Sequence, residues 1–102
     1  MKIIRDLVEM IDDELEGAEE YAKSAIHYKS EMPNLADAFY EIANQEMRHV
    51  NILHDQVVAI IKKHREEHGE PPAAMLSIWE WQHKKHIEES AEVRRLLDMY
   101  RG

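Results

Sequence analysis

The stretch FYEIANQEMRH, residues 39–49, places a carboxylate inside an apolar helical stripe. The residues of this stripe recur at alternating steps of four and three, the spacing of one face of a packed α-helix. They are Phe39, Ala43, Glu46, Val50, Leu53, Val57, Ile60 and His64. Burying an unpaired carboxylate is costly, and His49 follows Glu46 one turn later on the flank of the same face. The stretch therefore predicts that Glu46 and His49 are metal ligands.

The spacing Glu-x-x-His is weak evidence by itself, because it occurs a second time in this chain at Glu80 and His83. The prediction of a metal site therefore rests on the position of Glu46 within an apolar stripe and not on the spacing. The competing interpretation is that Glu46 is buried beside a cationic side chain of a neighbour, such as Arg48 of another chain.

The composition indicates one soluble helical domain covering residues 1–102. The chain is 44% apolar and 33% charged and has three glycines and three prolines, which argues against disorder. It has no cysteine. Disulfides, cysteine-bound metal clusters and a thiol nucleophile are therefore excluded, and the chain suits a reducing compartment.

The charge pattern limits the partners. Charges occur within the first six residues, and the longest apolar run is residues 57–61, so neither secretion nor membrane insertion is indicated. We expect a cytoplasmic protein. A net charge of −8 disfavours nucleic acid and anionic membrane surfaces and suits the attraction of cations.

Apolar periodicity predicts three helices, at residues 2–30, 34–67 and 73–100. Between the first two, Pro33 ends one helix and Asn34 is the predicted N-cap of the next. The short turn makes these two helices an antiparallel hairpin centred near residue 32.

The hairpin predicts which part of the first helix faces the Glu46 region. Reflection of Glu46 and His49 through residue 32 gives residues 15–18, so Glu16 lies at the right level. Glu19 lies about one turn nearer the connection but points closer to the apolar stripe, so either Glu16 or Glu19 could bind the metal.

FYEIANQEMRH, with EGAEEY (residues 16–21) in the preceding helix, resembles the ferritin-like superfamily, especially rubrerythrins and the short encapsulated ferritins. The resemblance covers roughly residues 8–64. In that family a di-iron site is built from one Glu on each of two helices and a Glu-x-x-His on each of the other two. The resemblance implies that the ligands are Glu16, Glu46 and His49, and that Glu46 bridges the two irons.

One chain supplies half of such a site. The resemblance therefore implies an all-α hairpin plus a third helix, with the four-helix bundle completed by dimerisation, in a homodimer or higher oligomer. The implied cofactor is iron, with manganese or zinc possible on the same ligands. The implied activity is oxidation of Fe(II) by oxygen or peroxide, with no catalytic residue beyond the metal ligands. The alternative is a rubrerythrin-like peroxide reductase, which would need an external electron donor because the chain has no cysteine-rich rubredoxin domain.

Five further residues are candidates for additional ligands or for contacts around the metal: Glu19, Glu20, Glu80, His83 and His86. For the two histidines, packed and hydrogen-bonded side chains are the favoured interpretation, and Glu20 is expected to face solvent. A function of another class is also open. In a metal-free helical assembly or adaptor, Glu46 would form an interface ion pair that fixes the register of the helices.

Overall fold

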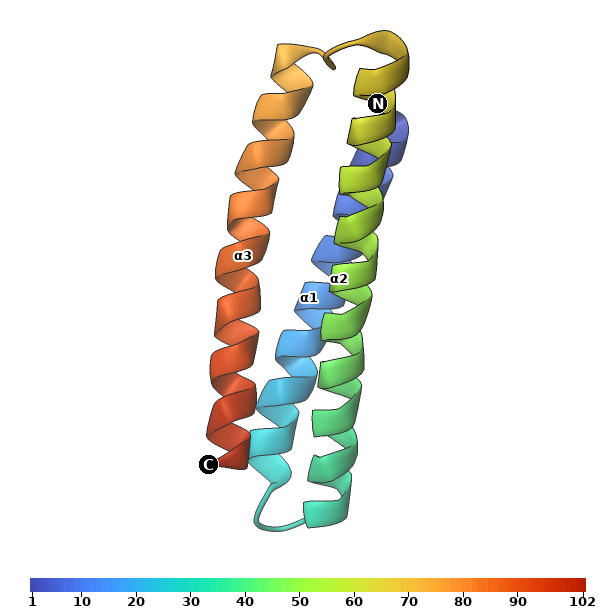
Figure 1. Ribbon diagram of the computed structural model, residues 1–102. Helices are drawn as coiled ribbons and strands as arrows, with labels where there is room; N and C mark the ends of the chain where they lie inside the picture. The colour runs from blue at the N-terminus through green and yellow to red at the C-terminus, as the bar shows by residue number, and fades with distance from the viewer.

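The computed structural model describes all 102 residues and consists of three long helices without strands (Figure 1). They are α1 (Lys2–Tyr28), α2 (Pro33–His68) and α3 (Ala73–Arg101). The molecule is a rod measuring 56 × 19 × 18 Å. Helix α1 packs along α2 as an antiparallel hairpin, and α3 packs chiefly on α1. The all-α prediction with three helices is confirmed.

A proline and a glycine determine where α2 begins and where it ends. Helix α2 begins at Pro33, whose missing N–H costs nothing in the first helical turn. Met32 is the N-cap residue, and no side chain makes a capping hydrogen bond, so the prediction of Asn34 as the N-cap is wrong. At the other end, Gly69 has φ 81° and donates its N–H to the carbonyl of Arg65 at 3.1 Å.

The core lies along the whole length of the hairpin. Ile11, Leu15 and Val57 are fully buried, and α3 adds Val93. Near the connection of the hairpin the buried residues are alanines, which let the two helix backbones approach closely. These are Ala18, Ala22 and Ala25 on α1 and Ala36 and Ala43 on α2.

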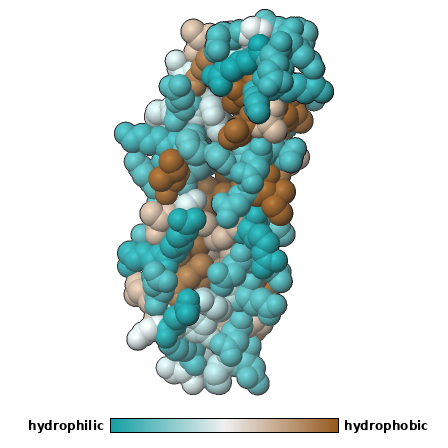
Figure 2. Space-filling model, viewed as in Figure 1, coloured by the Kyte–Doolittle hydropathy of each residue, from teal (hydrophilic) through white to brown (hydrophobic).

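The outer surface is mainly hydrophilic. On the face seen in Figure 2, hydrophobic residues form separate patches, chiefly in the upper half and at mid-length. None of the three helices combines the length and the apolar character needed to cross a bilayer.

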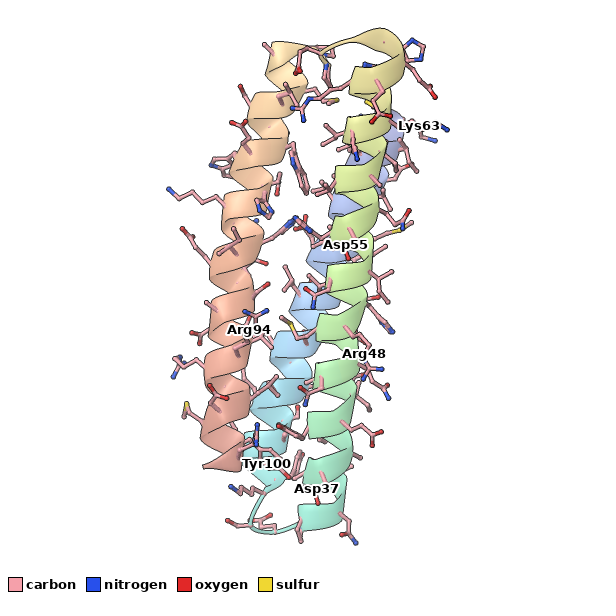
Figure 3. All side chains as sticks on the ribbon, in the orientation of Figure 1. Asp37, Arg48, Asp55, Lys63, Arg94 and Tyr100 are labelled. Carbon is pink, nitrogen blue, oxygen red and sulfur yellow. The ribbon has the colours of Figure 1, made fainter.

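Tyr100 fastens the end of α3 to the hairpin. Its hydroxyl donates a hydrogen bond to Asp37 at the start of α2, and its ring lies 4.8 Å from that of Tyr40 (Figure 3). Its backbone carbonyl accepts a hydrogen bond from the Lys29 ammonium. The hydrogen bond to Asp37 raises the pKa of Tyr100 to about 12, so the hydroxyl stays protonated at neutral pH.

Replacing Tyr100 by Phe removes this hydrogen bond and keeps the ring. We expect the substitution to lower the free energy of unfolding by about 1 kcal/mol, measured by urea denaturation. Tyr28→Phe is the matched control, because the hydroxyl of Tyr28 makes no side-chain hydrogen bond. Equal stability of the two variants would mean that Tyr100 holds α3 by packing alone.

Candidate metal centre

Three potential metal ligands converge where the middle of α1 faces α2. They are Glu14 on α1 and Glu46 and His49 on α2, and one ligand atom of each lies within 4.8 Å of the others. His49 Nδ1 is 3.3 Å from a carboxylate oxygen of Glu14. Carboxylate oxygen and imidazole nitrogen are the donors that suit iron, manganese and zinc. This group can hold a divalent cation.

Glu16 lies outside this group and is exposed. The prediction chose it because the centre of the hairpin was placed near residue 32. Helix α1 ends at Tyr28 and α2 begins at Pro33, so the centre lies between residues 30 and 31. That difference of about one and a half residues moves the level of Glu46 and His49 toward Glu14. The assignment of Glu16 as a ligand has no support from its position in the chain's fold.

Glu14 was missed, although the sequence holds a signal for it. It lies three residues after Ile11 and four before Ala18, both fully buried. It therefore sits within the apolar face of α1 as Glu46 sits within that of α2. The most regular apolar row of α1 runs through Ile11, Leu15 and Ala18, beside Glu14 and not through it.

The two carboxylates share a proton at neutral pH in the metal-free protein. The pKa of Glu46 is raised to about 7, chiefly by the hydrogen bond with Glu14 and also by partial burial and the negative charge of Glu14. The nearby His49 acts in the opposite direction. No lysine or arginine forms an ion pair with either carboxylate. A proton between Glu14 and Glu46 therefore reduces the repulsion of the two carboxylates, as a bound cation would.

Gly17 leaves room beside the Glu46 carboxylate. A Cβ atom built on Gly17 would lie 3.5 Å from Glu46 Oε2, an ordinary van der Waals contact. Glycine in the interior of a helix costs roughly 0.5 to 1 kcal/mol relative to alanine. An alanine would fit at this position, so the contact with Glu46 does not explain the glycine.

The other predicted residues lie elsewhere. Glu19 is bound to Lys23 at 2.9 Å, and Glu20 and Glu80 are exposed. His83 is half-buried, and His86 is buried with its Nε2 2.7 Å from Asp12 Oδ1. None of these five belongs to the Glu14 group, and the packed, hydrogen-bonded interpretation fits His86.

Comparison with known proteins gives no relative for this chain: no family model, curated protein or solved structure matches it. The function must therefore be argued from the site itself.

The shared proton predicts a pH dependence of stability. Between pH 4.5, the usual pKa of Glu, and about 7, the folded protein keeps a proton that the unfolded chain has released. The contribution of Glu46 to the free energy of unfolding therefore falls as the pH rises through this window. We expect Glu46→Gln to remove this fall, measured by urea denaturation of the metal-free protein at several pH values. Glu16→Gln, in an exposed neighbour, is the control and should keep it. The same slope in both variants would contradict the shared proton.

Proposed function

We propose that the chain binds ferrous iron at Glu14, Glu46 and His49 and oxidises it in a di-iron site shared by two copies of the chain. The observation that carries this proposal is the convergence of three ligand atoms within 4.8 Å around two carboxylates that form no ion pair with a lysine or arginine. Within the chain, Arg48 makes no ion pair and lies on the exposed side of α2 (Figure 3), where it could reach Glu46 only from a neighbouring chain.

The site is open on one side. The side chain of His49 is 52% exposed and that of Glu14 is 27% exposed. Three protein ligands leave several coordination positions of an iron ion for other donors. A second copy of the chain placed against this side would bring an equal set of ligands.

Both helices of the hairpin carry a row of residues suited to such a partner. We call the two rows together the outer seam. On each helix the members follow alternating steps of four and three, the pattern of a helix that packs against another helix. On α1 they are Ile3, Leu7, Met10, Glu14, Gly17, Tyr21, Ser24 and Tyr28, and on α2 they are Leu35, Phe39, Ile42, Glu46, His49, Leu53, Gln56 and Ile60.

The outer seam is turned away from α3. Asp12 and Asp37 reach α3, where they bind His86 and Tyr100. At 100° per residue, Asp12 points about 160° from Glu14, and on α2 the angle between Asp37 and Glu46 is about 180°. Helix α3 therefore covers one side of the hairpin and leaves the other free, with Met10 51% exposed on it.

Two hairpins packed through their outer seams would form a four-helix bundle around four glutamates and two histidines. This ligand set resembles that of the ferritin-like di-iron proteins, one Glu on each of two helices and Glu-x-x-His on each of the other two. The match uses Glu14 in place of Glu16. A twofold axis supplies both halves from a single sequence.

The ligand set suits iron oxidation. Two ferrous ions each give up one electron, and oxygen takes both electrons with two protons to become hydrogen peroxide. The carboxylates favour the ferric product because they are hard anionic donors, and His49 helps retain the ferrous ion. Because Glu46 must lose its proton to bind, affinity for the metal should increase as the pH rises through 7.

Metal binding distinguishes Glu14 from Glu16. We expect about one iron per chain after anaerobic loading with Fe(II), measured by elemental analysis, and ferric absorbance when oxygen is admitted. Glu14→Gln and Glu46→Gln should weaken binding at least about tenfold, since loss of even an outer contact to a ligand has an effect of that size. The control Glu16→Gln should bind as the parent does. Equal loss in Glu14→Gln and Glu16→Gln would point to the general negative charge of the helix.

Ferrous protein that is reoxidised much faster by peroxide than by oxygen would favour the peroxide reductase alternative with an external electron donor. Absence of bound iron in the parent would favour a metal-free helical assembly, in which the shared proton alone satisfies Glu14 and Glu46.

The outer seam predicts a dimer that a charge would break. Met10→Lys and Ile42→Lys place an ammonium group in the proposed interface, so we expect the dissociation constant of the dimer to increase at least about tenfold, or about 1.4 kcal/mol. Sedimentation equilibrium measures this constant. The control is Ile78→Lys on α3, which is 63% exposed and lies outside the outer seam. A parent protein that binds one iron per chain while remaining monomeric would rule out the shared site.

A further inference from the structure

A second group of possible ligands lies between α2 and α3, away from the outer seam. His54 of α2 and His83 and His86 of α3 line a cavity of about 180 Å³. None of these residues belongs to the Glu14 group. The proposed iron site leaves all three without a role.

The environment of His86 resembles that of a metal-binding histidine, because one ring nitrogen contacts a carboxylate and the other has no partner. It is only 4% exposed, and its Nε2 is 2.7 Å from Asp12 Oδ1. With its proton on Nε2 shared with Asp12, the other ring nitrogen, Nδ1, carries a lone pair. That Nδ1 is buried and has no hydrogen-bond partner. A carboxylate on one nitrogen and a free lone pair on the other are typical of a metal ligand with its outer contact.

His83, which lines the same cavity as His86, also has a ring nitrogen without a hydrogen-bond partner. This nitrogen is Nδ1, and it is buried. Burial lowers the pKa of His83, and the nearby His54 and His86 act in the same direction, which favours the neutral form of the ring. The neutral imidazole is the form that binds a metal. Two buried lone pairs beside one cavity leave a ligand or ordered water to satisfy them.

Electrostatics and ring geometry set the conditions for binding. Asp12 supplies one negative charge, and the chain as a whole has a net charge of −8. Arg94 also lines the cavity, but it is exposed and can turn toward solvent (Figure 3). The rings of His54 and His83 are stacked, with centroids 4.7 Å apart. As they lie, the three imidazoles do not bring one ring nitrogen each within 4.8 Å of the others, so one of the two stacked rings must rotate for all three to reach the same ion.

We propose that His54, His83 and His86 form a mononuclear site for a divalent transition-metal ion of the zinc class, with Asp12 orienting His86. Three imidazoles with a fourth position open to water or a small ligand are a common arrangement for zinc, and copper and nickel also bind imidazole well. The site is independent of the proposed iron site.

The test uses Glu46→Gln protein, which lacks the first site, with Co²⁺ as the optical probe and Zn²⁺ as competitor. We expect about one Co²⁺ per chain with the visible absorption of a low-coordinate site, displaced by Zn²⁺. His83→Gln and His86→Gln should weaken binding at least about tenfold. The control is His68→Gln, because His68 is exposed and its ring lies beside that of His64, away from the cavity. It should leave the site unchanged, and circular dichroism checks that each variant is folded.

Imidazole ¹⁵N spectra of the unsubstituted protein decide the matter without any substitution. Zn²⁺ should move the ring nitrogen signals of His54, His83 and His86 by the time two equivalents are present, enough to fill both this site and the Glu14 group. If these three signals stay in place, or if His83→Gln binds Co²⁺ as tightly as its parent, the proposal is overturned and the cavity holds water only. If added inorganic phosphate shifts the three rings to their protonated form, with the protons taken up from solvent, and Zn²⁺ has no effect, the proposal is likewise overturned, in favour of an anion site that includes Arg94. Iron binding at Glu46 is not affected by either result.

Discussion

The register of α1 against α2 is the constraint on which the other features depend. Only four residues, 29–32, connect the two helices, so the level at which each residue of α1 meets α2 is fixed. This register places alanines opposite the start of α2 and brings Glu14 to Glu46 and His49. A shift of one turn, about 5.4 Å, would separate the two carboxylates and would move Gly17 away from Glu46.

Much of the fold could be predicted, because it depends on local periodicity. The apolar residues of all three helices recur at helical spacing, and Pro33 and Gly69 mark the ends of α2. Glu46 and His49 were found because a charged residue interrupts an apolar row. Glu14 was missed because its identification requires the register of α1 against α2 to be known within two residues. That register depends on where α1 ends, and no single residue in the sequence indicates this end. The contact between Asp12 and His86 joins residues 74 apart in the sequence and could not be predicted without the packing of α3 on α1.

The two sides of the hairpin differ in what they leave unsatisfied. On the side of α3, the core is closed by Val93, Leu96 and Leu97, and the unsatisfied groups are the amide oxygen of Gln82 and the Nδ1 atoms of His83 and His86. On the outer seam, the unsatisfied feature is partly exposed apolar surface around a pair of acids. A lone pair inside a cavity needs a small ligand, whereas an exposed apolar row with helical spacing needs another helix. The same hairpin therefore supports two proposals that do not depend on each other.

The acid pair also bears on the kind of metal site that the hairpin can form. In a structural site the ligands repel one another or stay unpaired until the ion binds, so the metal-free chain is unfolded or much less stable. Here a shared proton joins Glu14 and Glu46 when no metal is present, because the pKa of Glu46 is about 7. The core of Ile11, Leu15 and Val57 is built from apolar side chains, and the acid pair is not part of it. Ligands that lie outside the core can exchange their ion, and the proposed oxidation of iron requires this exchange. The proton at Glu46 then competes with the metal near neutral pH, so the same carboxylate pair that tolerates the empty state also limits how tightly the ion is held.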